Sequence, residues 1–169
     1  MKGSLIGIVM GSDSDLPIMQ EAAKILDDFK VQYDITISSA HRSPELTTTY
    51  AKNAAKKGFE VIIAGAGGAA HLAGVIASKT SLPVIGVPID SSSLNGLDSL
   101  LSTVQMPSGV PVATMAIGKT GAKNGAILAI QILSLKYPEL KKKLNRYKNR
   151  LATETSKKAR RINKTLHKD

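Results

Sequence analysis

Short runs of apolar residues alternate along this chain with segments in which apolar residues recur at helical spacing. The runs are rich in Val and Ile and predict strands at residues 5–10, 31–38, 61–64, 83–88 and 112–117. The periodic segments predict helices at residues 15–29, 46–57, 70–78, 94–104 and 120–135. Nearly continuous apolar strands are typical of sheets covered on both faces. The alternation therefore predicts a doubly wound α/β fold, a three-layer α/β/α sandwich around a parallel sheet of about five strands.

The carboxy-terminal segment follows a different pattern. Pro138 begins a last predicted helix in which Leu140, Leu144, Tyr147 and Leu151 fall on one stripe. Soon after Leu151 the apolar positions nearly vanish. We therefore expect the end of the chain to be a lone helix lying on a neighbour, or to be frayed.

Charge is also unevenly distributed. Residues 1–135 carry ten Lys and Arg against ten Asp and Glu, whereas residues 136–169 carry 13 against three, which accounts for the whole net charge of +10. We divide the chain accordingly into a catalytic α/β domain and a basic C-terminal helix and tail. A basic tail can bind nucleic acid or an acidic membrane surface. Because no series of aromatic residues accompanies the charges for base stacking, we favour a solvated helix that binds neither.

Composition argues against several kinds of functional site and against secretion or membrane insertion. The chain has no cysteine, which excludes disulfides, thiolate metal sites and a cysteine nucleophile. Its histidines, His41, His71 and His167, show no paired ligand spacing, so we expect no metal site. The amino end lacks the long apolar region of a secretory signal, and no apolar stretch is long enough to cross a bilayer. We expect a soluble, cytoplasmic protein.

Three polar motifs follow the first three predicted strands. They are GSDSD at residues 11–15, SAHR at residues 39–42 and GAGGAAH at residues 65–71. In a parallel sheet the loops that leave the carboxyl ends of the strands open on one edge, so these motifs should converge on one pocket. Hydroxyls, glycine amides, an arginine and two histidines in one pocket indicate an enzyme for a small phosphorylated anion.

The second motif carries the best candidate for proton transfer. Ser43, Pro44 and Glu45 form a strong helix start, with Ser43 as the cap, so His41 and Arg42 occupy the turn before a helix amino terminus. Arg42 can grip a phosphate or carboxylate there, although it could instead pair with a surface carboxylate such as Glu45. Histidine exchanges protons near neutral pH, which makes His41 a candidate general acid/base.

The first motif offers hydroxyls and N–H groups at the start of a helix, an arrangement that suits a phosphate. Ser12 and Ser14 supply the hydroxyls. An aspartate facing a phosphate would repel it, so Asp15 is better placed to accept hydrogen bonds from sugar hydroxyls or to cap the helix. A simple Ser/Asp helix cap explains this motif almost equally well.

The third motif leaves a rival function open. Residues 65–70 match G-x-G-x-x-A after a strand, and Asp90 lies about twenty residues further on, as expected of a dinucleotide site. A small oxidoreductase binding NAD or a flavin is therefore one alternative, and a nucleic-acid module acting through the tail is another. Against the first, the fingerprint normally opens the first βα unit of its domain. His71, in the first turn of the next helix, could contact a ligand or simply pack.

Taken together, the motifs resemble a known family. The three motifs, together with VQMP at residues 104–107 and AIGK at residues 116–119, closely resemble the class I N5-carboxyaminoimidazole ribonucleotide mutases, also called the catalytic subunit of phosphoribosylaminoimidazole carboxylase. The likeness covers about residues 5–135 and leaves the tail outside. It implies a flavodoxin-like fold, a homo-octamer and a cofactor-independent isomerase of purine biosynthesis. It also implies a possible hand-off of substrate from N5-carboxyaminoimidazole ribonucleotide synthetase.

The resemblance also implies roles for individual residues. His41 would be the catalytic proton carrier, and Ser12, Asp15 and Arg42 would bind the ribose phosphate. The loop at residues 65–72 would surround the imidazole and its carboxylate. The full set of implied substrate-binding residues is Ser12, Ser14, Asp15, Ser39, Ala40, Arg42, Gly65, Gly67, Gly68, Ala69, His71 and Leu72. Arg42 bears on the subclass, because related carboxylases that use carbon dioxide directly typically have lysine after the histidine.

Overall fold

The computed structural model describes residues 3–91 and 93–166, and its core is a five-stranded parallel sheet. The strands are β1 (Ile6–Met10), β2 (Tyr33–Ile37), β3 (Val61–Gly67), β4 (Val84–Ile89) and β5 (Ala113–Thr114). They lie in the order β2-β1-β3-β4-β5, which is the flavodoxin-like arrangement with its switch point between β1 and β3. The structure therefore confirms the predicted fold class.

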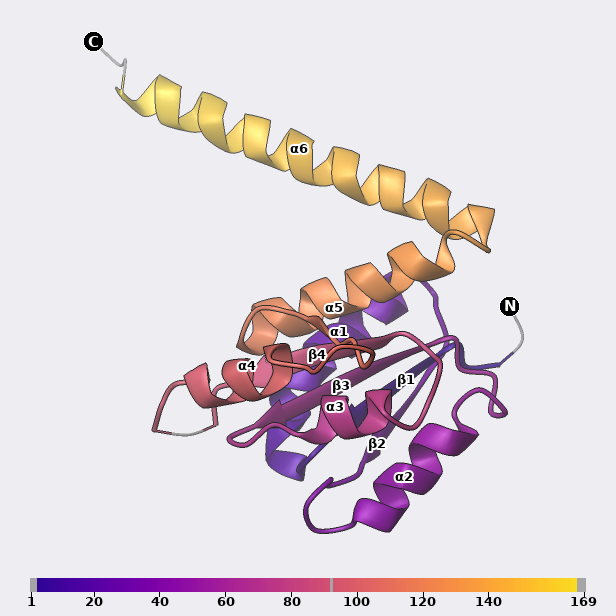
Figure 1. The fold of residues 1–169 in the computed structure, drawn as a ribbon. Helices are drawn as coiled ribbons and strands as arrows, with labels where there is room; N and C mark the ends of the chain where they lie inside the picture. Colours follow the sequence, from indigo (N-terminus) through magenta and orange to yellow (C-terminus); the bar gives the residue numbers. More distant parts are fainter. Residues whose placement is uncertain (1–2, 92, 167–169) are drawn as a thin grey trace.

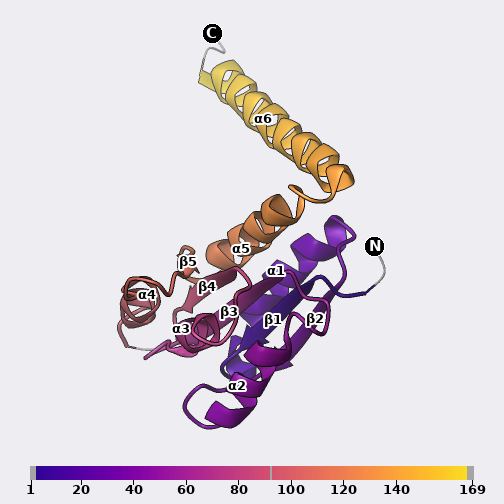
Figure 2. The ribbon, with the colours of Figure 1, turned by 45° about the vertical axis from the view of Figure 1, so that its right-hand side comes forward.

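Helices cover both faces of this sheet (Figures 1 and 2). Helices α1 (Leu16–Asp28) and α5 (Gly118–Leu133) pack together on one face. Helices α2 (Pro44–Asn53), α3 (Leu72–Ala77) and α4 (Leu97–Val104) lie on the other. The strands contribute buried Val and Ile side chains to both cores, so the sheet is an apolar layer held between two sets of helices.

Strand boundaries differ from the prediction in two informative places. Strand β3 continues to Gly67, rather than ending at residue 64, because Gly65, Ala66 and Gly67 pair with the end of β4. The first glycines of the third motif therefore belong to a strand. Strand β2 lies at the edge of the sheet, and its Ile35 and Ile37 side chains are 38% and 48% exposed. The expectation of a sheet covered on both faces is wrong for this strand.

The last helix, α6 (Pro138–Leu166), packs on the α1/α5 core only through its first turns. Leu140 and Leu144 are buried, and the Tyr147 ring lies 5.5 Å from that of Phe29, whereas Leu151 is largely exposed. The remainder projects away from the body as a continuous helix (Figure 1). Within the described ranges, no helix is both long enough and apolar enough to span a membrane. Residues 167–169, which include His167, lie outside them.

Helix α5 packs closely against the loop that precedes it, and Gly121 lies at the contact. A Cβ atom at Gly121 would lie 1.6 Å from the backbone oxygen of Ala116, whereas one at Gly125 would meet only side-chain atoms at 3.3 Å or more. Gly121→Ala should lower the free energy of unfolding by roughly 2–3 kcal/mol, because a backbone carbonyl cannot move aside. Gly125→Ala, one turn along the same helix, should change it by less than about 1 kcal/mol. Urea denaturation of both variants measures the difference, and equal effects would contradict this account.

Candidate active site

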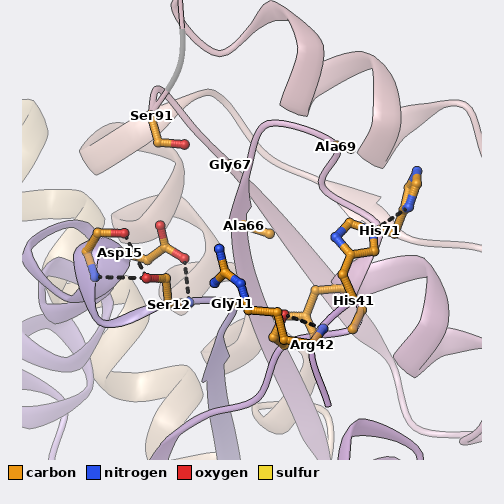
Figure 3. Close-up of a pocket in the computed structure, with 14 residues that line it drawn as sticks. Gly11, Ser12, Asp15, His41, Arg42, Ala66, Gly67, Ala69, His71 and Ser91 are labelled. Carbon is orange, nitrogen blue, oxygen red and sulfur yellow. Dashed lines mark hydrogen bonds between the residues drawn. The ribbon is translucent and has the colours of Figure 1, made fainter. Parts of the chain in front are cut away.

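A cavity of about 370 Å³ opens at the carboxyl edge of the sheet, where the first three strands end. The three motif loops line it together with the residue that follows β4 by two positions (Figure 3). Its lining residues are Gly11, Ser12, Ser14, Asp15, Ser39, Ala40, His41, Arg42, Ala66, Gly67, Ala69, His71, Leu72 and Ser91. The predicted convergence of the loops on one pocket is thus present in the structure.

The first loop is a capping box around a short 3-10 turn, η1 (Asp13–Asp15). The Ser12 N–H donates to Asp15 Oδ2 over 3.0 Å, and the Ser14 N–H donates to Ser12 Oγ over 3.4 Å. Burial raises the pKa of Asp15, and the N–H groups of Ser12 and Gly11 oppose that shift. One Asp15 oxygen therefore serves the cap, and its role toward a sugar stays a prediction.

Asp13 completes the hydrogen bonding of this loop from outside the cavity. Its Oδ1 accepts from Ser12 Oγ over 2.9 Å and from the Ser14 N–H over 3.1 Å. These bonds, led by that from Ser12, lower the pKa of the Asp13 carboxyl. The Ser12 hydroxyl could donate to a bound phosphate only after it gives up its hydrogen bond to Asp13. The first loop therefore has hydroxyl donors, but they are engaged within the loop until a ligand replaces their partners.

The second loop is fixed by two serines. The Ser43 N–H and Oγ both donate to the Ser39 carbonyl, at 2.9 and 3.1 Å, while the Arg42 N–H donates to Ser39 Oγ over 3.1 Å. Pro44 begins α2 as predicted, but Ser43 makes no side-chain cap bond to that helix. Ser43 therefore occupies the expected N-cap position, but its hydroxyl turns back to hold the loop instead of bonding to the helix.

The two cavity histidines contact each other. His41 Nε2 lies 2.8 Å from His71 Nδ1, and the ring planes are nearly perpendicular at 83°. One of these nitrogens must carry the proton that joins them. His71 is exposed and makes no capping hydrogen bond, so it is not the packed or capped histidine of the alternative interpretation.

Arg42 points its guanidinium from the second loop toward Gly11 and Ser12 (Figure 3). Among the described residues no carboxylate forms a salt bridge with it, so the alternative of an ion pair with Glu45 or Asp15 is not what the structure contains. The side chain therefore brings a positive charge to the cavity without a direct ion pair, close to the serine hydroxyls of the first loop, and this charge helps to lower the pKa of the Asp13 carboxyl.

The third loop consists of small residues, and its backbone lies close to Ser91. A Cβ atom at Gly67 would overlap Ser91 Oγ, and Gly68 has a φ of 60°, a conformation that favours glycine. Of the described residues, Gly65 and Gly68 are not among those that line the cavity. Gly65 packs in the sheet against Met19. Their expected contact with substrate stays a prediction.

Three lining residues were missed by the sequence reasoning, namely Gly11, Ala66 and Ser91. Ser91 follows β4, and the rule that polar residues after parallel strands meet at one edge would have identified it. Gly11 and Ala66 belong to the predicted motif loops, but neither was named as a contact. Within residues 3–91 and 93–166, no three His, Asp or Glu side chains come together as a potential metal site.

The geometry does not support the dinucleotide alternative. The fingerprint requires a tight glycine turn directly between a strand and a helix. Here Gly65 and Gly67 are paired within β3, and α3 begins only at Leu72. Asp90, the expected ribose partner, does not line the cavity among the described residues and instead lies beside Gly118 at the start of α5.

Comparison with known proteins identifies the family of this chain. The family model described as AIR carboxylase matches residues 5–154. The chain belongs to the AIR carboxylase family. A curated relative from Pyrococcus horikoshii, named N5-carboxyaminoimidazole ribonucleotide mutase, is 65% identical over 94% of this chain and 88% of its own. A relative of the same name from Thermotoga maritima is 59% identical over 97% of this chain and 95% of its own.

Solved structures of the AIR carboxylase family have the same fold. The crystal structure of Treponema denticola PurE superposes with a TM-score of 0.84 at 29% identity, covering 94% of this chain and 98% of that one. These findings confirm the resemblance that the motifs indicate. The family match also extends to residue 154, well into α6 and beyond the expected limit near residue 135.

Proposed function

We propose that this member of the AIR carboxylase family is an N5-carboxyaminoimidazole ribonucleotide mutase. It converts its substrate to 4-carboxy-5-aminoimidazole ribonucleotide in purine biosynthesis, and the level of identity to relatives of that name supports this assignment. The observation that carries the proposal is the position of His41, which reaches a cavity shared with Arg42, the Ser12 loop and the glycine loop. That cavity is within the usual size range of small-molecule sites.

The phosphate end of the nucleotide would lie between the first and second loops. Arg42 supplies the charge, and Ser12 and Ser14 supply hydroxyl donors once the bond to Asp13 is exchanged. Asp15 faces the same part of the cavity and would accept from a ribose hydroxyl. Ser39 holds the Arg42 N–H and so positions this loop, with Ala40 beside it.

The imidazole would lie against the third loop, from Gly67 to Leu72, with His41 beside its C4 atom. The carboxyl group leaves N5 as carbon dioxide, and the enamine-like C4 attacks that carbon to form the new C–C bond. His41 gives N5 its proton as a general acid when the carboxyl group leaves. As a general base it then removes the C4 proton, which restores the aromatic ring and returns the histidine to its starting state. This sequence needs no redox or carboxyl-carrying cofactor. Confinement of carbon dioxide in the cavity supplies the proximity on which the second step depends.

His71 would act on this chemistry through His41. Its Nδ1 holds His41 Nε2, and this bond fixes the orientation of the catalytic ring. His71 also lines the cavity and can contact the substrate carboxylate. We assign it as a positioning and binding residue.

The proposal also covers how copies of the chain assemble. Leu97, Leu101 and Val104 form an apolar stripe along α4, and each is about half exposed. An exposed stripe of this kind is typical of a subunit interface. We propose that it is buried in a homo-octamer, as the family resemblance implies. A cytoplasmic location and direct transfer of substrate from the synthetase complete the proposal.

The decisive experiment compares two substrates. Purified protein is mixed either with N5-carboxyaminoimidazole ribonucleotide or with aminoimidazole ribonucleotide plus bicarbonate, and formation of the 4-carboxy product is followed. A mutase converts the first directly, at a rate independent of added bicarbonate. Product formed only from the second mixture would reject the assignment in favour of a carboxylase. His41→Asn should still bind the aminoimidazole nucleotide but lose about 10²–10⁴-fold in turnover, because the base is gone.

Arg42 provides a separate test of substrate binding. Arg42→Ala should weaken the affinity for aminoimidazole ribonucleotide by about 10–100-fold, because one charged hydrogen-bonding group is lost from the phosphate position. Lys52→Ala, which removes an exposed charge from the last turn of α2, is the matched control and should leave affinity nearly unchanged. Calorimetric titration measures both, and equal affinities for the two variants would count against the role of Arg42.

The octamer is tested at the α4 stripe. Leu101→Glu places a charge in the proposed interface and should reduce the particle mass measured by light scattering from eight copies of the 17.8 kDa chain to a smaller assembly. Leu135→Glu, at a residue that is 88% exposed outside α4, is the control and should not change the mass. An intact octamer in the Leu101 variant would remove α4 from the interface.

A further inference from the structure

A second cavity, of about 420 Å³, lies where the end of α1 meets the first turns of α6. Because α1 runs back from the carboxyl edge of the sheet, its carboxyl end lies near the opposite edge from the active site (Figure 2). The lining residues are Asp28, Phe29, Lys30, Lys143, Arg146, Tyr147 and Arg150. None of them belongs to the motif loops, so this cavity is distinct from the one proposed for catalysis.

The cavity is strongly basic. Lys30, Lys143, Arg146 and Arg150 line it, against the single carboxylate of Asp28, which leaves a local excess of three positive charges. Cations are expected near a helix carboxyl end, where backbone carbonyls carry negative partial charge. The end of α1 accounts for one of them, since the Lys143 ammonium donates to the Phe29 carbonyl.

The other cations differ in their local compensation. The Arg150 guanidinium is partly compensated, because it lies 5.4 Å from the Tyr147 ring centre and 4.0 Å from an exposed Glu154 carboxylate, a long ion pair. In the part of the chain that the structure describes, neither the Lys30 ammonium nor the Arg146 guanidinium has a hydrogen-bond or ion-pair partner. Like charges held together in one cavity repel each other, and a bound anion would relieve that repulsion.

Lys30 occupies its position at a conformational disadvantage. Its φ is 53°, in the left-handed region that glycine adopts without strain and that commonly ends a helix. Glycine would therefore stabilise this turn better than lysine does. Lys30 lines the cavity in spite of this strain, which indicates that its positive charge contributes to binding there.

The walls of the cavity are rigid. Phe29 is buried, its ring packs at 59° against Tyr147, and Leu144 anchors the same turn of α6 in the core. The backbone that carries these cations is consequently held by a packed junction, in contrast to that of the projecting half of α6, while the Lys30, Arg146 and Arg150 side chains are themselves exposed. A fixed backbone keeps the cations close together, which lowers the cost of gathering them around an anion.

We propose that this cavity binds a small polyanion with two adjacent phosphate groups, of the pyrophosphate class. Two phosphates match the excess of three cations, because Arg146 and Arg150 lie one turn apart on α6 and Lys30 lines the same cavity from the turn after α1. The confined volume favours a compact ligand over an extended nucleic-acid strand. This inference does not depend on the proposed catalytic function.

Calorimetric titration of the full chain with inorganic pyrophosphate tests the proposal at low and at near-physiological salt. Lys30→Gly and Arg146→Ala should each weaken binding by about tenfold or more, as expected for loss of a charged partner. Lys148→Ala removes the same charge from α6 outside the cavity, and it should weaken binding by less than about twofold. Lys30→Gly should also unfold at an unchanged or higher temperature, which separates loss of the charge from loss of the fold.

Four outcomes would overturn the site. They are an absence of measurable binding to the unaltered protein, equal weakening by all three substitutions, preference for a single-stranded RNA probe over pyrophosphate, and loss of binding in Arg42→Ala. Equal weakening, or preference for the RNA probe, would mean diffuse attraction to a basic helix. Loss in the Arg42 variant would place the pyrophosphate in the catalytic cavity.

Discussion

The structure depends on the parallel register of three strands. Met10 at the end of β1 pairs with Ile37 of β2 on one side and with Gly65 of β3 on the other, so β1 and β2 end at the same level and β3 runs two residues further, to Gly67. The three motif loops leave from this edge of the sheet. Because one residue of slip in a parallel pair would move a loop by about 3.3 Å and turn its side chains to the other face, the active-site geometry is fixed by the sheet.

The same sheet carries glycines where side chains from the helical layers approach it closely. Gly7 lies against the Tyr50 hydroxyl and the Phe59 ring, and Gly65 lies against Met19, so helices from both layers approach the central strands closely. Tyr50 is buried with its hydroxyl unpaired, and burial raises its pKa. Close packing is thus maintained even where a polar group loses its partner. Gly65 is best understood as part of this packing, whereas Gly67, which faces Ser91, borders the cavity.

The fold and the position of the pocket could be predicted from the sequence, whereas two hydrogen bonds of the site could not, for physical reasons. Alternating strands and helices determined the fold, and the positions of the motifs after strands determined the pocket. Local patterns could not show that the Ser43 hydroxyl would choose the Ser39 carbonyl over the helix, since both partners lie within reach. The bond between His41 and His71, 30 residues apart, depends on how β1 separates β2 from β3 in the sheet, and strand order cannot be read from one sequence.

The projecting half of α6 is exposed along its described residues. After Leu144 no residue of this helix is buried in the described chain, and isolated helices of this composition are marginal in water. Its local support is weak, consisting of the Arg150–Glu154 pair at 4.0 Å and threonine hydroxyls that donate to carbonyls one turn back. Such a helix is expected to persist only when something covers it. A neighbouring subunit of the proposed octamer would supply that cover, and the basic cavity would then lie at the base of an arm shared between subunits.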